Sequence, residues 1–466
     1  MWTEEQWDVI APKHASSVVV AGPGSGKTTV MTEHMAQRIA GGWTPAHRIL
    51  AMTFTRQAAE HMRQKLRGHE RLRTVDVESC TMGTFHAVFF RALLEADVDV
   101  YPVLSQREQY AVMREAMVEV LGERRAVSMH EVQSCLTAYS RAVGAQTLEG
   151  LDRRMKKILR AYDQKKRAMN RWDHDDILMA SLRLFHSPAA SKGRLFQMEY
   201  VLVDEFQDTN ELQWVLFSSL LERNGALGFV VGDDDQSIYA FRGASPVFLQ
   251  RAAKSLPHAQ QYLLTFNFRS DRLILRRAAS LIRHVRERVD KPLRGVRDAD
   301  GICRAYQVRD RAEQWRLAAY LLQHAASRNF SSAVLGRTRN QLAAAWAALR
   351  RLLGTDGENV VGRPEFRTFH DSKGKEWDSV ILLDMAVSCV ANLNSDEERR
   401  LLYVAMTRAR HELYALVPRV MDGIPKCVHP FLLEAGIGVE QLHGGDEERD
   451  LGSKLGEKSL DFSGCN

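Results

Sequence analysis

The sequence predicts an α/β fold built on parallel sheets, and three observations support this prediction. Short apolar runs rich in β-branched residues recur between segments whose apolar residues have helical spacing. Continuous apolar strands that alternate with helices are typical of parallel sheets covered by helices on both faces. Residues 89–180 have helical spacing only, and a glycine-rich segment follows the first apolar run. The first of these two features indicates a helical insertion.

Length and composition limit the class of protein. The chain has 466 residues, 45% of them hydrophobic, so we expect two or three domains. The formal net charge of +6 is compatible with a nucleic-acid partner but does not identify one. Neither a signal-peptide pattern nor an apolar run of membrane-spanning length is present, so we expect a cytoplasmic protein without a membrane partner. Six scattered cysteines are expected to be buried or free thiols in a reducing cytosol.

The apolar runs give the expected strands. They lie at residues 16–22, 48–54, 200–205, 228–234, 262–266, 380–386 and 412–417. Helical spacing is clearest at residues 106–122 and 151–171. The segment 151–171 and a second basic stretch at residues 269–297 are compatible with contacts to phosphates and equally with a solvated helix face.

A glycine-rich loop follows the first apolar run. It reads Ala21, Gly22, Pro23, Gly24, Ser25, Gly26, Lys27, Thr28 and Thr29. A loop of this kind between a strand and a helix is the context of a phosphate-binding loop, because glycine lets backbone N–H groups surround phosphates closely. We expect Lys27 to contact the β and γ phosphates of ATP and Thr28 to bind Mg²⁺.

A later apolar run ends in two acids, Asp204 and Glu205. Ligands of open α/β sheets bind at the carboxyl ends of the strands. Asp204 is suited to bind Mg²⁺ and Glu205 to polarise the attacking water, because phosphoryl transfer depends on positioning and charge neutralisation. Acids at a strand end can also be helix N-caps, but the glycine-rich loop favours a nucleotide site.

Longer motifs surround these residues and extend along most of the chain. They read Asp204-Glu205-Phe206-Gln207-Asp208-Thr209-Asn210, Gly232-Asp233-Asp234-Asp235-Gln236-Ser237-Ile238-Tyr239-Ala240-Phe241-Arg242-Gly243-Ala244, Thr53-Phe54-Thr55, Gly83-Thr84-Phe85-His86, Asn267-Phe268-Arg269-Ser270, and the segments 368–377 and 397–409. Taken in their order along the chain, these motifs resemble those of the superfamily 1 DNA helicases of the UvrD, Rep and PcrA group. The resemblance implies an ATP-dependent translocase and helicase that moves 3′ to 5′ on single-stranded DNA.

The resemblance also implies two RecA-like P-loop domains, called 1A and 2A, with ATP between them. A helical 1B insertion interrupts 1A. The implied ranges are 1–88 and 181–261 for 1A, 89–180 for 1B, 262–443 for 2A and 444–466 for a polar tail. Relatives carry a large 2B domain within 2A, but only residues 340–364 occupy that position here. We therefore expect 2B to be absent or vestigial.

The nucleotide residues follow from the matching motifs. The resemblance assigns Gln6 to the adenine edge, Glu376 to the ribose and Phe268 to stacking on the base, where relatives use Tyr. The implied catalytic residues are Lys27, Glu205, Gln236, Arg269 and Arg408. Gln236 would sense the γ-phosphate, and the two arginines would neutralise its charge during cleavage.

The DNA residues are implied in the same way. They are Thr53, Phe54, Thr84, His86, Tyr239, Phe241 and His370. Single-strand motors need aromatic faces on which bases of any sequence can stack. Phe241 stands where relatives commonly carry Trp. Without the motif, Phe54 would be assigned to the core.

Two functions remain open at this stage. The first is an autonomous motor that acts on single-stranded DNA and on junctions of single and double strands. The second is an ATP-dependent sensor or loading subunit, because a core without 2B is similar to helicase-like subunits of bacterial anti-phage systems such as Gabija, whose partner is an OLD-family nuclease. A nucleic-acid-binding scaffold with an inactive ATPase is disfavoured by the complete set of catalytic residues.

Overall fold

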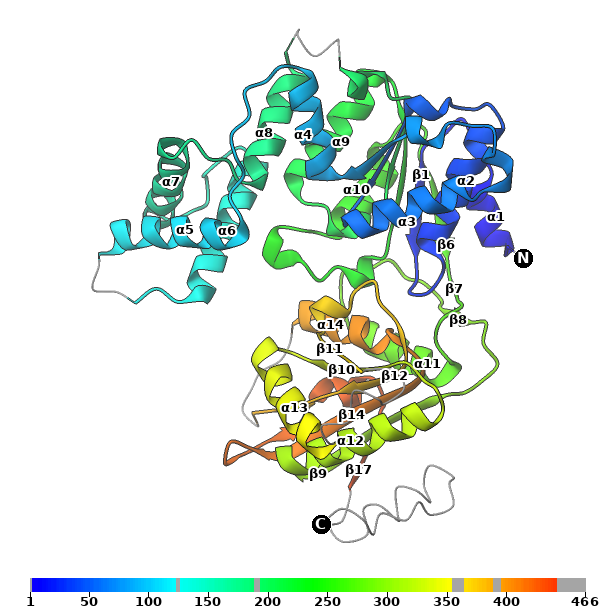
Figure 1. The fold of residues 1–466 in the computed structure, drawn as a ribbon, viewed down its shortest axis with the longest axis vertical. Helices are drawn as coiled ribbons and strands as arrows, with labels where there is room; N and C mark the ends of the chain where they lie inside the picture. The colour runs from blue at the N-terminus through cyan, green and yellow to red at the C-terminus, as the bar shows by residue number, and fades with distance from the viewer. Residues whose placement is uncertain (1, 123–125, 188–192, 354–363, 389–394, 442–466) are drawn as a thin grey trace. The chain divides into compact units, whose positions relative to one another are not determined.

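The computed structural model describes residues 2–122, 126–187, 193–353, 364–388 and 395–441. The chain forms two compact units (Figure 1). The first comprises Met1–Phe266 and Arg288–Pro292, and the second comprises Asn267–Glu287 and Leu293–Asn466. Each unit contains a sheet whose long strands are parallel, which confirms the predicted α/β class. The predicted tail at 444–466 lies outside the described residues.

The first unit is built on a six-stranded parallel sheet of order β3-β2-β4-β5-β1-β6. Its strands are β1 (Ser17–Ala21), β2 (Ile49–Thr53), β3 (Thr81–Thr84), β4 (Tyr200–Val203), β5 (Leu227–Gly232) and β6 (Gln260–Leu264). Neighbouring residues of a strand point to opposite faces. Val18 and Val20 belong to the core on one face, and Val19 and Ala21 to the core on the other. Burial of both faces explains why the run is continuously apolar.

Different helices cover the two faces of this sheet. The core that contains Val18 includes residues of α4 (Phe85–Glu95), α8 (His174–Phe185), α9 (Glu211–Asn224) and α10 (Val247–Ser255). The core that contains Val19 includes residues of α1 (Glu4–Ile10), α2 (Lys27–Ala40) and α3 (Arg56–Arg67). The first unit is therefore a three-layer α/β/α arrangement.

The expected boundary between the domains at residues 261 and 262 falls inside β6. That strand pairs in parallel with β1 along its whole length, and the first unit continues to Phe266. The segment Arg288–Pro292 also belongs to the first unit, although the chain on both sides of it belongs to the second. Both differences arise from contacts with residues far away in the sequence.

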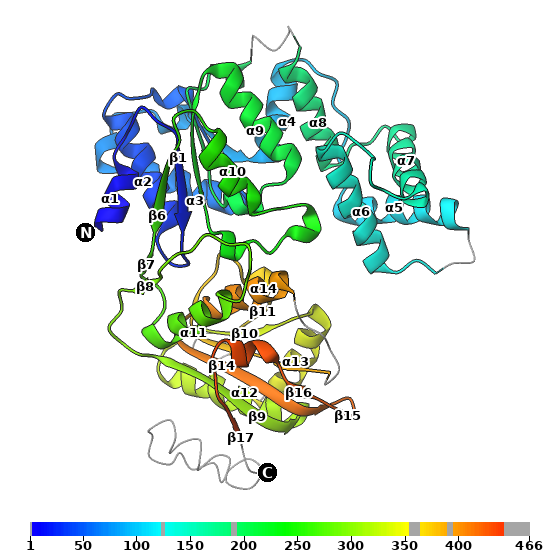
Figure 2. The same ribbon diagram turned by 180° about the vertical axis from the view of Figure 1, so that it is seen from behind.

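The helical insertion has a core of its own. It contains α5 (Gln106–Leu121), α6 (Met129–Gly144) and α7 (Arg153–Ala168), whose apolar faces pack together. Both views show these helices standing apart from the strands (Figures 1 and 2). By contrast, Phe89 and Ile177, near the ends of the predicted insertion, are part of the sheet's core. The helices that lead in and out, α4 and α8, are thus anchored on the sheet.

Four basic residues near the end of the stretch 151–171 have acidic partners within the insertion. Lys166 is buried and donates hydrogen bonds to Asp173 and Asp176 at 2.7 and 2.6 Å. Three further ion pairs are Lys165–Glu119, Arg167–Asp163 and Arg171–Glu108. The residues in these pairs have acidic partners in the protein itself, which favours the structural interpretation for this part of the stretch.

The second unit is built on a sheet of order β11-β10-β12-β14-β9-β17, with β15 paired to β14. Its strands are β9 (Ile302–Asp310), β10 (Ser332–Gly336), β11 (Glu365–Thr368), β12 (Trp377–Leu382), β14 (Ala409–Met421), β15 (Ile424–Pro425) and β17 (Val439–Gln441). Its helices are α11 (Arg272–Ile282), α12 (Arg311–Ser327), α13 (Arg339–Leu352), α14 (Asp396–Met406) and α15 (Pro430–Glu434). Two short pairs, β7 (Phe266–Asn267) with β8 (Arg294–Gly295) and β13 (Ala386–Val387) with β16 (Cys427–Val428), complete the strands.

The position of the 2B insertion lies between β10 and β11. The described residues there form α13, while residues 354–363 lie outside the described part. Among the described helices, none has both the length and the apolar character needed to cross a membrane. Cys80, Cys135 and Cys303 are buried free thiols as expected, but Cys427 is disulfide-bonded. The expectation was wrong for Cys427, because sequence spacing does not reveal which cysteines the fold brings together.

Substitution of Met113 tests which residues form the core of the insertion. It is fully buried in α5, and Met113→Ala should lower the free energy of unfolding of the insertion by roughly 2–5 kcal/mol, because it leaves a cavity. Met129 begins α6 and is 64% exposed, so Met129→Ala should change stability by no more than about 0.5 kcal/mol. Urea unfolding followed by circular dichroism measures both. Equal effects of the two substitutions would contradict this assignment of the core.

Candidate nucleotide site and nucleic-acid cleft

The glycine-rich loop joins β1 to α2. Gly24 and Gly26 have φ angles of 63° and 82°, in the left-handed region that glycine adopts without strain. Helix α2 begins at Lys27, and its N-cap Gly26 has no side chain that could accept from the first N–H groups. These N–H groups and the positive end of the helix dipole favour an anion at this point. The loop therefore has the backbone geometry of a phosphate site.

Gln6 holds the outside of this loop. Its side-chain Nε2 donates to the carbonyl oxygen of Ser25 at 3.1 Å, and its Oε1 accepts from the backbone N–H of Thr3. Gln6 is only 6% exposed. The residue predicted to read adenine thus also ties α1 to the phosphate-binding loop. Thr29, the last residue predicted for the loop, is exposed and accepts a hydrogen bond from Lys65.

The predicted Mg²⁺ ligands lie side by side. The Thr28 hydroxyl donates to Asp204 Oδ2 at 2.8 Å, across 176 residues of sequence. Burial, with a smaller contribution from the neighbouring Glu205, raises the pKa of the Asp204 carboxyl to about 6. A hydroxyl and a carboxylate are the oxygen ligands that Mg²⁺ prefers, and a bound cation would stabilise the ionised carboxylate. The residues present therefore fit Mg²⁺.

Glu205 has a strained backbone. Its φ of 52° and ψ of 41° are left-handed, a conformation that costs a residue with a side chain of order 1–3 kcal/mol and is found at functional sites. Its N–H donates to Asp204 Oδ1 at 2.9 Å, and its carboxylate accepts from Gln207 Nε2 at 2.6 Å. These contacts hold the Glu205 carboxylate near the predicted metal ligand Asp204, the residue before it in the chain.

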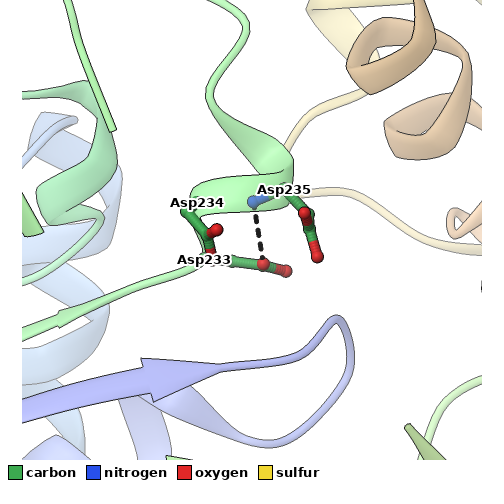
Figure 3. A group of neighbouring side chains, drawn as sticks. All are labelled: Asp233, Asp234 and Asp235. Atoms are coloured by element: carbon green, nitrogen blue, oxygen red, sulfur yellow. Dashed lines mark hydrogen bonds between the residues drawn. The ribbon is translucent and has the colours of Figure 1, made fainter. Parts of the chain in front are cut away.

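Three buried aspartates follow β5 (Figure 3). Oxygens of Asp233, Asp234 and Asp235 lie within 4.8 Å of one another, a spacing that could suit a metal. In this protein the Lys291 ammonium contacts all three, with distances of 3.2 Å to Asp233 and 3.0 Å to Asp235. Burial alone would lower the pKa of Lys291, but the three carboxylates outweigh it and raise the pKa above its ordinary value. The cluster is therefore an ion-pair site occupied by the protein's own lysine.

Gln236 is positioned by the same cluster. Its Nε2 donates to Asp233 Oδ2 at 2.6 Å. Arg288 donates two hydrogen bonds to Asp235, at 3.0 and 2.9 Å. The sequence analysis did not identify Lys291 as a site residue, and it placed Arg288 only within a generally basic stretch. The spacing of three residues between Arg288 and Lys291 was the only hint in the sequence, and it indicates an ion-pair site only once the buried aspartates are located in the fold.

The remaining nucleotide residues belong to the second unit. Arg269 donates to Glu376 Oε2 at 2.5 Å and to the carbonyl oxygen of Thr407 at 3.2 Å. Burial alone would raise the pKa of Glu376, but hydrogen bonds from Arg410 and Arg269 outweigh it and lower the pKa. Glu376, predicted to hold ribose, is therefore ionised and bridges two arginines. Phe268 is 38% exposed, as a base-stacking side chain requires.

Arg408 is held inside the second unit. It is 2% exposed, and its Nε and Nη1 donate to the carbonyl oxygens of Val404 and Lys375, at 2.8 and 3.3 Å. Its Nη2 also donates to the Thr407 hydroxyl at 3.1 Å. Two of these three bonds hold the guanidinium on backbone carbonyl oxygens. Removing it from this position would require replacement of each of these bonds.

Most of the predicted DNA residues line one cleft of the first unit, with a volume of about 410 Å³. They are Thr53, Phe54, Thr84, His86, Tyr239 and Phe241. Phe54 and Tyr239 are stacked, with ring centroids 5.4 Å apart, and Phe241 meets Tyr239 edge-on at 5.9 Å. His370 belongs to the second unit and is not among the lining residues. Residues of three separate sequence motifs therefore meet in one aromatic cleft.

The helical insertion supplies the other wall of the cleft. Its lining residues there, which the sequence analysis did not single out, include Gln106, Gln109, Tyr110, Gln133, Ser140, His174 and Asp175. The insertion also holds the loop of Phe241. Thr137 donates to the Phe241 carbonyl oxygen, and Arg141 Nη2 donates to the Ala240 carbonyl oxygen at 3.2 Å. The position of Tyr239 and Phe241 thus depends on α6.

His86 of the cleft is uncharged at neutral pH. Burial, with a smaller contribution from His174, lowers the pKa of His86 to about 3. The two imidazole rings meet edge-on at 4.8 Å. Neutral His86 can stack or form hydrogen bonds but does not neutralise a phosphate. Its predicted contact with DNA is therefore compatible with a base or sugar rather than an ion pair.

Residues 2–257 match the UvrD/REP helicase N-terminal domain, which is more than half of the chain. The chain belongs to the UvrD/REP helicase family. Residues 366–416 match the UvrD-like helicase C-terminal domain of the same family. The membership implied by the sequence motifs is thus confirmed.

Individual relatives agree with the family match. The chain is 30% identical to the putative ATP-dependent DNA helicase YjcD of Bacillus subtilis, over 63% of this chain and 40% of that protein. It is 29% identical to the ATP-dependent DNA helicase PcrA of Leuconostoc citreum, over 62% of this chain and 40% of that protein. It is 28% identical to the ATP-dependent DNA helicase PcrA of Staphylococcus epidermidis, over 72% of this chain and 48% of that protein. The matched region spans less than half the length of each relative.

His34 gives the nucleotide unit a defined pH dependence. It lies on α2, is fully buried, and its Nδ1 donates to the carbonyl oxygens of Val9 and Ile10, while Nε2 accepts from the Tyr200 hydroxyl. Burial, assisted by Arg38, lowers the pKa of His34 to about 4. Below pH 6.5 the unfolded chain therefore binds a proton that the folded protein excludes, and stability falls as the pH falls toward 4.

The His34→Gln variant should remove this dependence while keeping a donor and an acceptor. Between pH 8 and pH 5 the parent should lose about 2 kcal/mol more of its free energy of unfolding than the variant. Urea unfolding at the two pH values measures the difference. Parallel pH dependences for the two proteins would contradict the assignment.

Proposed function

We propose that this chain is an ATP-driven translocase that moves 3′ to 5′ along single-stranded DNA and can open junctions of single and double strands. The observation that best supports the proposal is the aromatic cleft. Six residues drawn from separate family motifs line it, and every nucleic-acid base has a face that can stack on an aromatic ring. Polar amides on the opposite wall, from α5 and α6, offer hydrogen bonds that do not require one sequence.

Each predicted nucleotide residue has a role in the proposed ATP chemistry. Lys27 and the N–H groups of the loop would hold the phosphates, and Glu205 would polarise the attacking water. Thr28 and Asp204 would hold Mg²⁺, whose charge would offset that of the phosphate oxygens. Gln236, Arg269 and Arg408 would respond to the γ-phosphate, in the roles that the family resemblance implies. Gln6, Phe268 and Glu376 would bind the nucleoside.

One loop is suited to couple the two activities. Gln236, Tyr239 and Phe241 all lie in the segment that follows β5. This segment contains two short 3-10 helices, η7 (Asp234–Gln236) and η8 (Ala240–Arg242). A change at Gln236 when the γ-phosphate is lost would be transmitted through a few backbone residues to the base-stacking platform. ATP turnover would thereby alter the grip on DNA.

A second function is supported by the short segment at the 2B position. A core without 2B suits an ATP-dependent sensor or loading subunit for a partner such as a nuclease, with little unwinding of its own. The two functions share the ATP site and the cleft. They differ in what the isolated chain does to duplex DNA.

Tailed duplexes distinguish these functions. With ATP and Mg²⁺, the chain should displace a strand from a duplex with a 3′ single-stranded tail and not from one with a 5′ tail. Glu205→Gln should bind the same DNA but lower ATP turnover by at least about 100-fold, because the water is no longer polarised. ATP turnover that single-stranded DNA fails to stimulate would rule out the motor. Stimulated turnover without displacement would favour the sensor.

Tyr239 tests the cleft. Tyr239→Ala should weaken binding of a single-stranded oligonucleotide by about 1–3 kcal/mol, because one base loses its aromatic face. Tyr101→Ala is a matched control, since Tyr101 is 42% exposed in the same unit and does not line this cleft. Fluorescence anisotropy measures both affinities. If the two variants bind DNA equally well, the cleft is not the track.

A further inference from the structure

We propose that Lys291 is a positioning residue for ATP cleavage, which acts through Asp233 on both Gln236 and Glu205. The proposal rests on the proposed ATPase function and deepens it. It concerns the segment Arg288–Pro292, which we call the strap. The strap is anchored on the first unit, while the residues before and after it belong to the second unit.

The strap is anchored by buried charge rather than by apolar contact alone. The Lys291 side chain is 0% exposed and contacts the three aspartates that follow β5. Arg288 forms two hydrogen bonds with Asp235, and the N–H of Val289 donates to Asp234 Oδ2 at 2.6 Å. Charges removed from water are held firmly only when they are paired, so this geometry defines the strap's position closely.

Asp233 is the branch point of the network. One carboxylate oxygen, Oδ1, lies 3.2 Å from Lys291 Nζ, and the other, Oδ2, accepts from Gln236 at 2.6 Å. The lysine therefore fixes the carboxylate that orients the γ-phosphate sensor. The same Oδ1 also accepts from the backbone N–H of Asp235 at 3.2 Å. Loss of the ammonium would remove one of these two contacts of Oδ1, so the acceptor for Gln236 would be held less firmly.

The backbone of Asp233 extends the network to Glu205. The Asp233 N–H donates to Gln207 Oε1 at 3.0 Å, and Gln207 Nε2 donates to the Glu205 carboxylate at 2.6 Å. Gln207 is fully buried. Its amide thus has one end on the loop that Lys291 holds and the other on the residue that polarises water.

The space around Gln207 requires the glycine before Asp233. A Cβ at Gly232 would lie 2.5 Å from Gln207 Oε1 and 3.1 Å from the Gln207 nitrogen. The end of β5 and the Gln207 amide are therefore in direct contact. A displacement of the Asp233 loop cannot be absorbed by empty space and must move Gln207.

The strap gives this network a connection to the second unit. The chain enters the strap from Glu287 and leaves it at Leu293, and both belong to the second unit. A change in the second unit can therefore reach Glu205 through Lys291, Asp233 and Gln207. In this arrangement Lys291 transmits position and does not touch ATP.

The test compares two variants of the network with a matched control in the full-length chain. Lys291→Met removes the ammonium, and Gln207→Glu keeps the acceptor for Asp233 but replaces the donor to Glu205 by a repelling carboxylate. Lys166→Met is the control, because Lys166 is a buried lysine of the same unit held by two carboxylates in the helical insertion. Steady-state ATP turnover is measured with and without single-stranded DNA, and circular dichroism verifies folding.

A positioning role predicts a separation of kcat from KM. Lys291→Met and Gln207→Glu should each lower kcat by at least about tenfold with KM for ATP changed less than about threefold, since binding contacts remain. Lys166→Met should retain basal kcat within about twofold. The double variant of Lys291 and Gln207 should lose less kcat than the product of the two single effects, because the two residues share the route through Glu205.

The proposal is overturned if folded Lys291→Met has parental kcat, or if Lys166→Met lowers basal kcat equally. If Lys291→Met does not fold, Gln207→Glu decides, and parental kcat in that variant overturns the proposal. If single-stranded DNA does not stimulate ATP turnover by the unsubstituted protein, the proposed motor function is contradicted instead. The comparison of basal turnover between the variants then still tests the role of Lys291.

Discussion

Parallel pairing in the first unit is the constraint on which the candidate site depends. In a parallel sheet all strands end at the same edge, and ligands of such sheets bind there. The glycine-rich loop follows β1, the predicted Mg²⁺ ligand Asp204 follows β4, and the aspartate cluster follows β5. Thr53 and Thr84 are the last residues of β2 and β3. Residues separated by up to about two hundred positions in the sequence therefore meet at one edge of the sheet because of the parallel pairing alone.

The order of the strands then divides this edge into two regions. In the order β3-β2-β4-β5-β1, the nucleotide residues follow three adjacent strands, and the first two predicted DNA segments follow the outer pair. The loop after β5 contributes to both, because it contains Gln236 near its start and Tyr239 and Phe241 near its end. Strand order thus explains how a chemical event at phosphate and a stacking surface for bases can share one short segment.

Two buried lysines of the first unit are paired with carboxylates. Lys291 and Lys166 are both enclosed by carboxylates, one at the end of the sheet and one in the helical insertion. The cleft is lined by aromatic and amide side chains, and its His86 is neutral because burial lowers its pKa. The basic net charge of the chain is therefore a poor guide to where a nucleic acid binds, since several basic residues are committed to partners within the protein.

The sequence by itself determined the α/β class, the principal strands, the phosphate-binding loop and the family, because each rests on local spacing or on contiguous motifs. It also led to the residues that the cleft brings together, through resemblance rather than geometry. Only the tertiary structure decided that Gln6 ties α1 to the loop, that Arg408 is buried on backbone carbonyls, and that Arg288–Pro292 is anchored on the first unit. These facts depend on contacts such as Lys291 with Asp233, whose partners are far apart in sequence, and no local pattern specifies which buried charges will meet.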